Sequence, residues 1–133
     1  MTGVASHEPR STSIKSFTDL RAWREAHVLA VKIYKVTQNF PKNEVFGLTT
    51  QIRRASVSVT SNIAEGFGRR SQADRLRFYD MARALLAEVQ SQLLIARDVD
   101  YMDKTIFNQL AIMAVDAHKI LTGLINATKG RDS

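Results

Sequence analysis

The chain has 133 residues, with 19 Lys and Arg against 13 Asp and Glu, so its formal net charge is +6. This length predicts one domain with its own core, and the lack of cysteine excludes disulfides, thiolate catalysis, zinc ribbons and iron–sulfur clusters. With only two Pro and six Gly, the composition favours helices over the many tight turns of an all-β protein.

The N-terminal segment 1–16 is polar and lacks the apolar run of a signal peptide, so we expect a disordered tail. No stretch is long and apolar enough to predict a membrane span. With no cysteine and no export signal, a cytoplasmic location is the default expectation. From Thr18, a candidate N-cap, apolar residues recur at steps of three and four and predict a helix as far as Thr37. Its expected inward positions are Leu20, Trp23, Ala26 or His27, Ala30, Ile33 or Tyr34, and Thr37.

A second helix is expected from about Glu44 to Ala64. The run Val57–Thr60 within it is β-prone in isolation, so a strand is the competing interpretation. Helix is favoured because an apolar stripe continues on both sides of this run, and the many Ser and Thr residues allow a neighbouring helix to approach closely. A glycine of the segment 66–68 is expected to end the helix in the left-handed conformation. The stripe consists of Leu48, Ile52, Ala55, Val59 and Ile63.

Two further helices follow. Ser71 and Asp74 resemble a capping box that starts a third helix over about 72–98, and Asp103 is the expected cap of a fourth over about 104–128. Short connections place successive helices antiparallel. The sequence therefore predicts an all-α, up-down-up-down four-helix bundle over residues 17–129, with a short tail at 130–133. The inward positions are Leu76, Tyr79, Ala82, Leu86, Val89, Leu93 and Ala96, then Ile106 or Phe107, Leu110, Met113 or Ala114, Ala117, Leu121 and Leu124.

Catalytic and metal-binding patterns are missing from the sequence. A di-iron bundle needs Glu-x-x-His pairs, but Arg24 and Val115 stand three residues before His27 and His118. We expect no metal site and no cofactor, and place His27 at the edge of the core with one nitrogen hydrogen-bonded. The segment 66–71 lacks the third glycine of a dinucleotide fingerprint, and there is no nucleophile elbow or P-loop. An enzymatic function is not expected.

The positive charge is concentrated in one stretch. Residues 47–77 hold six arginines against Glu65 and Asp74, a net charge of +4. Arginine suits bidentate contacts to phosphate, and the start of the third helix offers backbone N–H groups to an anion. The alternative is a solvated face with ion pairs inside the bundle or between subunits, and the charge pattern alone does not separate the two. The candidate nucleic-acid contacts are Arg53, Arg54, Arg69, Arg70, Arg75 and Arg77.

Several sequence blocks resemble the four-helix bundle proteins encoded within intervening sequences of bacterial 23S rRNA genes. The resemblance covers about residues 17–127, and its most specific part is the block Ser-Asn-Ile-Ala-Glu-Gly-Phe-Gly-Arg at 61–69. Thr60 departs from the pattern, because family members often carry proline there. The other matching blocks are Phe17-x-Asp19-Leu20-x-x-Trp23, Phe40-Pro41, Phe46-Gly47-Leu48-Thr49 and Gln51-Ile52-Arg53-Arg54-Ala55.

The resemblance implies a small cytosolic bundle that assembles into a homopentameric ring, with no known enzymatic activity. The chain is also similar, through fold and charge, to the accessory proteins of diversity-generating retroelements, which bind nucleic acid and a reverse transcriptase. Our main hypothesis is an oligomer that binds RNA or DNA through its arginines. The alternative is a protein-interaction scaffold, or a reverse-transcriptase accessory protein, whose Arg and Glu residues make inter-subunit contacts. The expected structural or inter-subunit residues are Asn62, Glu65, Gly66 and Gly68.

Overall fold

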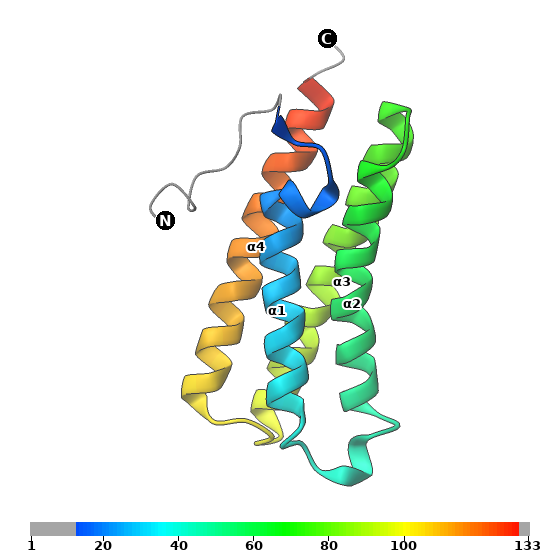
Figure 1. The fold of residues 1–133 in the computed structure, drawn as a ribbon. Helices are drawn as coiled ribbons and strands as arrows, with labels where there is room; N and C mark the ends of the chain where they lie inside the picture. The colour runs from blue at the N-terminus through cyan, green and yellow to red at the C-terminus, as the bar shows by residue number, and fades with distance from the viewer. Residues whose placement is uncertain (1–12, 131–133) are drawn as a thin grey trace.

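The structure, a computed structural model, describes residues 13–130 and contains four long helices (Figure 1). They are α1 (Arg21–Thr37), α2 (Leu48–Phe67), α3 (Gln72–Asp98) and α4 (Lys104–Gly130). Each runs opposite to the one before it (Figure 1). Both α1 and α3 pack against α2 and α4, so α1 and α3 lie diagonally across the bundle. The predicted all-α four-helix bundle is confirmed.

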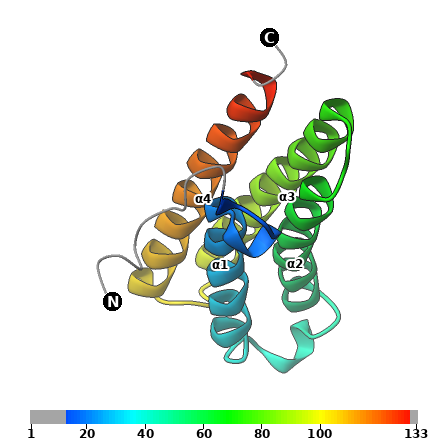
Figure 2. The ribbon, with the colours of Figure 1, turned by 45° about the horizontal axis from the view of Figure 1, so that its top comes forward.

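One end of the bundle is uneven. Figure 2 shows the turn between α2 and α3, and the end of α4, projecting past the start of α1. The described residues that precede α1 lie across this end, and Ile14 packs against the core. Residues 13–16 of the predicted tail therefore contact the bundle, whereas 1–12 and 131–133 lie outside the described residues.

The buried faces follow most of the predicted apolar stripes, but Leu48, Leu76 and Leu124 are only partly buried, and Ile125 is buried beside Leu124. In α2, Ile52, Ala55, Val59 and Ile63 are buried, and the β-prone run 57–60 is helical, so the preference for helix over strand is confirmed. The hydroxyl of Thr60 donates to the Val57 carbonyl at 2.6 Å inside this helix. The α3 and α4 cores contain Tyr79, Ala82, Leu86, Val89, Leu93, Ala96, Phe107, Leu110, Ala114, Ala117, Leu121 and Ile125.

The structure shows which of the alternative inward positions of α1 are buried. Ala26 and Ile33 are buried, whereas Tyr34 is 42% exposed. His27 is exposed and stacks on Trp23, with ring centroids 4.7 Å apart. Its predicted place at the core edge is therefore wrong, because the buried stripe passes through Ala22, Ala26, Leu29 and Ile33 on a neighbouring face of the helix.

The first helix begins later than predicted, and Thr18 is not its N-cap. A short 3-10 turn spans Phe17–Asp19 and is capped by Ser16, while the extended backbone of Leu20 separates this turn from α1. The Asp19 carboxylate accepts the backbone N–H groups of Lys15 at 2.9 Å and Ser16 at 3.1 Å. These two hydrogen bonds lower the pKa of Asp19.

Glu44 lies outside α2, which begins only at Leu48, so the predicted start of the second helix is wrong by one turn. The carboxylate nevertheless caps the helix, because Oε1 accepts the Leu48 N–H at 3.0 Å. Its Oε2 accepts the Tyr101 hydroxyl at 2.5 Å. Both hydrogen bonds lower the pKa of Glu44, and the bond from the Tyr101 hydroxyl has the larger effect. Glu44 thus joins the start of α2 to the loop between α3 and α4.

The end of α2 differs from the glycine cap that the sequence predicts. The helix continues past Ala64 to Phe67, and Gly68 follows it with φ −81°, so the predicted left-handed glycine is wrong. Gly66 is buried within the helix instead, and a Cβ atom there would lie 2.7 Å from Cε1 of Tyr79. Glycine is required at position 66 because α2 and the buried Tyr79 ring of α3 approach too closely for a side chain.

The caps of α3 and α4 agree better with the prediction. The Ser71 hydroxyl accepts the Asp74 N–H at 3.1 Å, but only this half of the capping box forms. Asp103 accepts the Ile106 N–H at 2.8 Å, which confirms it as a cap. In the break between the helices, Asp100 adopts φ 64°. The fourth helix extends two residues beyond its predicted end and includes Gly130.

By length and composition alone, α4 is also the one helix of residues 13–130 that is apolar enough to cross a membrane, with a mean hydropathy of 1.3 over its best window. In the bundle one face of α4 forms core. The helix also has apolar residues outside this buried face, because Ile112 and Val115 are exposed.

Candidate nucleic-acid interface

The six candidate arginines divide into two groups. Arg53 and Arg54 lie in the first half of α2, and the others lie where α2 turns into α3. A helix rises about 1.5 Å per residue, so roughly 20 Å of helix separates Arg54 from the end of α2 at Phe67, which precedes Arg69. A single surface made of all six is therefore not formed within one chain. We call Arg69, Arg70, Arg75 and Arg77 the tip cluster.

Arg53 is tied into the bundle. Its Nε donates to the Thr37 hydroxyl at 2.8 Å, and Nη2 donates to the Tyr34 carbonyl at 3.4 Å. The guanidinium carbon also lies 4.7 Å from the centre of the Tyr34 ring. A cation beside the last carbonyls of α1 complements the negative end of that helix. These contacts give Arg53 a structural use within its own chain, and leave Arg54 as its exposed neighbour.

In the tip cluster, two guanidinium groups lie near one aromatic ring. The guanidinium carbons of Arg69 and Arg77 are 4.6 Å and 4.5 Å from the centre of the Phe78 ring. Such contacts attract a cation to the ring and restrict the motion of a long side chain. Both guanidiniums therefore lie against the same ring at the surface, and each also has a carboxylate nearby.

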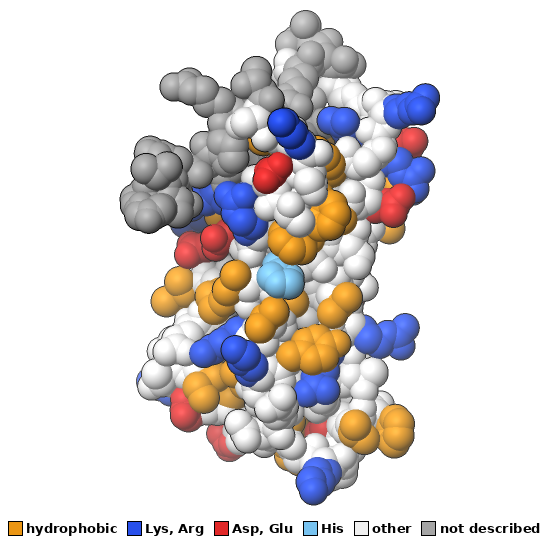
Figure 3. Space-filling view, in the orientation of Figure 1, with side chains coloured by type: hydrophobic (Ala, Val, Ile, Leu, Met, Phe, Trp, Pro, Cys, Tyr) orange, Lys and Arg blue, Asp and Glu red, His pale blue; other side chains and the backbone are white. Residues whose placement is uncertain are grey.

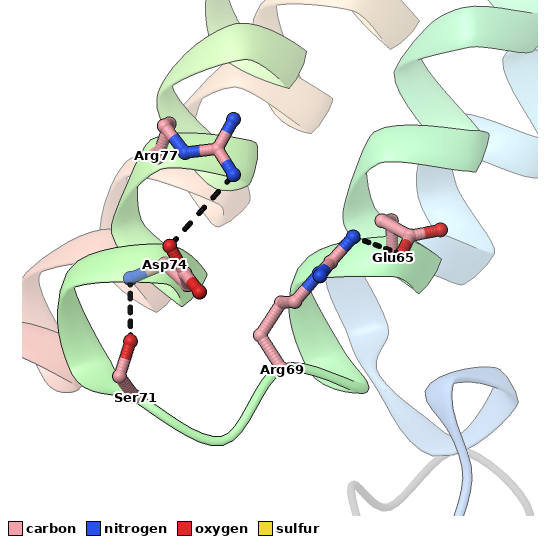
Figure 4. A network of polar contacts seen from close by, with 5 residues as sticks. All are labelled: Glu65, Arg69, Ser71, Asp74 and Arg77. Carbon is pink, nitrogen blue, oxygen red and sulfur yellow. Dashed lines mark hydrogen bonds and ion pairs between the residues drawn. The ribbon is translucent and has the colours of Figure 1, made fainter.

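The cationic groups of the tip cluster have different local environments, and Figure 4 shows those of Arg69 and Arg77. Arg69 pairs with Glu65 at 2.6 Å and Arg77 pairs more loosely with Asp74 at 3.7 Å. The Glu65 pair lies within one chain. Arg70 is exposed, and no hydrogen bond or ion pair joins its side chain to residues 13–130.

Arg75 is a partly buried member of the tip cluster. Its Nε donates to the Arg69 carbonyl at 2.7 Å, and its guanidinium carbon lies 6.0 Å from the centre of the Phe67 ring. It also lines a cavity of about 200 Å³ at this end of the bundle, between the residues before α1 and the ends of α2 and α4. Arg75 therefore braces the turn, whereas Arg70 and Arg77 extend outward.

The first turn of α3 is already occupied by protein groups. Ser71 accepts one of its free N–H groups, and the carboxylate of Asp74 supplies a negative charge there (Figure 4). An anion at the tip would therefore depend on the guanidinium groups more than on the helix N-terminus.

The other predicted structural residues have contacts within the chain. The Asn62 side-chain amide donates to the Ser58 carbonyl at 2.8 Å. The Gly68 N–H donates to the carbonyls of Ala64 at 3.3 Å and Glu65 at 3.1 Å. Together with the close approach at Gly66, these contacts stabilise the end of α2 that positions Arg69.

Metal ligands and pockets are two features of residues 13–130 that bear on catalytic chemistry. Within residues 13–130 there is no group of three or more His, Cys, Asp or Glu side chains able to hold a metal. A pocket of about 340 Å³ lies beside Arg53, and its lining contains Lys42, Thr37 and Thr49 but no carboxylate or histidine.

Phe78 belongs to this site, although the sequence analysis did not place it among the candidate contacts. Aromatic residues at helical spacing usually belong to the core, as Tyr79 does. The adjacent Arg77 is the one feature of the sequence that indicates a cation beside this ring. The turn between α2 and α3 also brings Arg69 to the ring, and no sequence pattern predicts the path of that turn.

Comparisons with known proteins agree on the fold. The family model described as "23S rRNA-intervening sequence protein" matches residues 18–123. A solved structure from Bacteroides thetaiotaomicron, described as a protein with unknown function from the S23 ribosomal protein family, is similar with a TM-score of 0.71. It is 22% identical in sequence, and the alignment covers 78% of this chain and 97% of that one. No curated protein matches the chain. Neither description names a catalytic activity.

Proposed function

The chain belongs to the family of 23S rRNA-intervening sequence proteins, and from this premise we propose that it is a non-enzymatic, oligomeric bundle whose tip cluster binds the phosphates of RNA or DNA. The observation that carries the proposal is the pair of guanidiniums on Phe78, next to the exposed Arg70. Arg70 and Arg77 make the main phosphate contacts, Arg69 assists, and Arg75 holds the turn.

Assembly would strengthen a weak site. One chain offers a few phosphate contacts, but an oligomer repeats the tip cluster, and linked sites bind a long polyanion far more tightly than one site does. Each copy also adds a formal charge of +6 to the field that attracts nucleic acid. We propose a homo-oligomer, a pentamer by the family resemblance, acting in the cytoplasm.

The binding test compares variants with equal loss of charge. R70Q/R77Q removes two cations from the tip, and K42Q/K104Q removes two exposed cations from the opposite end of the bundle. We expect the tip variant to bind a fluorescent 20-nucleotide RNA or DNA roughly tenfold more weakly at low salt, with little change for the control. Equal affinity of both variants and the wild type would overturn the proposal.

A second candidate is the interaction scaffold, including a reverse-transcriptase accessory protein. Exposed apolar residues on α1 and on α4, such as Val28 and Ile112, favour a protein partner. The inter-subunit version of this idea needs free arginines, yet Arg69 already pairs with Glu65 of its own chain. Under the scaffold hypothesis R70Q/R77Q lowers the oligomer mass in light scattering, and nucleic-acid binding is negligible for every variant.

A further inference from the structure

Two separate apolar faces remain on the surface of the described bundle. The first, which we call the α1 face, runs along the outward side of α1, where Val28 is 54% exposed and Val31 is 40% exposed. Figure 3 shows hydrophobic side chains gathered over this side of the molecule. The α1 face consists of Trp23, His27, Val28, Val31 and Tyr34.

The second face is a groove between α3 and α4 with a volume of about 170 Å³. Leu94 is 44% exposed and Val115 is 43% exposed at this site, and Ile112, adjacent on α4, is 61% exposed. Some of the apolar residues of α4 that lie outside the bundle core are therefore at this groove. The α3–α4 groove is lined by Gln90, Leu93, Leu94, Phe107, Ala111 and Val115.

The two faces lie on different sides of the bundle, because α1 packs against α2 and α4 and is diagonal to α3. A chain cannot place its own α1 face in its own groove. Both faces remain available at once, so one copy has room to contact two others.

We propose that the α1 face of one copy packs into the α3–α4 groove of a second copy. Val28, Val31 and Lys35 follow each other at steps of three and four residues and form a ridge along α1. Side chains at this spacing lie on one face of a helix, so they can enter the space between two helices of a neighbouring molecule together. The proposal rests on the oligomer part of the proposed function and specifies its interface.

The charges around the two faces are complementary. Helix α1 carries four basic residues against one acidic residue, a net charge of +3. Residues 88–116, which contain the α3–α4 groove, carry five acidic against two basic residues, a net charge of −3. Asp98 follows Leu94 by one turn of α3, and Asp116 follows Ile112 by one turn of α4. Asp98 already pairs with Arg97 at 2.8 Å, and that guanidinium lies 4.9 Å from the centre of the Phe107 ring in the groove lining. Asp116 is therefore the carboxylate beside the groove that remains for a basic residue of α1 such as Lys35. This complementarity favours a second copy of the chain as the occupant.

Contact between unlike faces has a defined consequence for assembly. A head-to-tail interface continues from copy to copy and closes into a ring, or grows as a filament if the rotation does not close. A symmetric contact between two α1 faces would instead stop at a dimer.

The test uses two variants, each with one face disabled. V28E/V31E places carboxylates on the α1 face, opposite the acidic rim, and A111W fills the α3–α4 groove without changing its charge. Size-exclusion chromatography with light scattering should find an oligomer for the wild type and the single-chain mass of 14.9 kDa for each variant alone. A 1:1 mixture should form a heterodimer of twice that mass, because one intact face of each kind remains.

The heterodimer also shows that both variants are folded. The matched control is M81E, which adds a carboxylate at an exposed apolar position of α3 outside both faces and should leave the wild-type mass unchanged. A monomeric wild type, a variant that stays oligomeric, or a mixture that stays monomeric would overturn the proposed interface. Both variants keep the tip cluster, so their binding of the 20-nucleotide probe reports on the proposed function independently.

Discussion

At the scale of single residues, neighbours in the sequence have different environments. Arg53 and Arg54 are adjacent members of the same basic stretch, yet Arg53 bonds to Thr37 and Tyr34 while Arg54 points to solvent. The sequence predicts the same role, contact with nucleic acid, for both residues, because their charge and residue type are the same. Only the position of α1 beside α2 separates them, and that position depends on tertiary packing.

We therefore predict different effects for the two substitutions. R53Q should lower the free energy of unfolding by about 1 kcal/mol, because it removes a charged hydrogen bond and a ring contact. R54Q should leave the free energy of unfolding within about 0.5 kcal/mol of wild type, since an exposed residue without partners contributes little. Urea unfolding at pH 7 measures both, and equal losses would contradict the structural use of Arg53.

Gly66 offers a second test at this scale. G66A should destabilise the protein by about 1–3 kcal/mol, because its Cβ would lie within 3.0 Å of two ring carbons of the buried Tyr79. The control is G123A in α4, where nothing lies within 4 Å of the new Cβ. This substitution should stabilise by about 0.5–1 kcal/mol, because alanine is the better helix former. A harmless G66A would mean that the two helices are not in close contact there.

At the scale of elements, the apolar periodicity predicted the helices and their buried faces well. Ile52, Val59 and Ile63 of α2 are buried as their spacing requires. Helix ends were predicted less well, because they depend on contacts between distant segments. Glu44 caps α2 from outside the helix and bonds to Tyr101, which lies 57 residues away in the chain. A local reading of the sequence includes Glu44 in the helix.

The Glu44–Tyr101 bond predicts a dependence of stability on pH. Since the folded pKa of Glu44 lies below its ordinary value of 4.5, the ionised carboxylate stabilises the fold above that pH. The contribution is lost as pH falls through the lower folded pKa. E44Q should therefore be less stable than wild type at pH 7, and the difference should shrink as pH falls below 4.5.

Urea unfolding midpoints at several pH values test this prediction. The Y101F variant is the matched control, because it removes the hydroxyl that donates to Glu44 and leaves the cap of Leu48 in place. It should show a smaller loss with the same direction of pH dependence. A stability difference between E44Q and wild type that stays constant from pH 7 to pH 3 would exclude a role for the ionised Glu44.

At the scale of the whole molecule, the two proposed surfaces occupy different parts of the bundle. The tip cluster lies at the start of α3, and the α3–α4 groove begins at Gln90, more than a dozen residues further along that helix. At about 1.5 Å per residue, roughly 20 Å separates them. Assembly through the groove would leave each tip cluster exposed, so oligomerisation and phosphate binding would reinforce each other.

The charge of +6 was visible in the sequence, and so was its concentration between residues 47 and 77. The sequence did not show that α2 separates this stretch into two groups, or that Phe78 brings Arg69 and Arg77 together. Helix periodicity predicts which side chains point inward. It carries no information about how a turn arranges the side chains that point outward.

The salt dependence of nucleic-acid binding tests the central claim most directly. The logarithm of the binding constant falls linearly with the logarithm of salt concentration, with a slope of about −0.7 for each phosphate contact on a single strand. Relative to wild type, R70Q/R77Q should reduce the magnitude of the slope by about 1.4, while K42Q/K104Q should leave it unchanged. An R70Q/R77Q slope equal to the wild-type slope would contradict phosphate binding at the tip cluster.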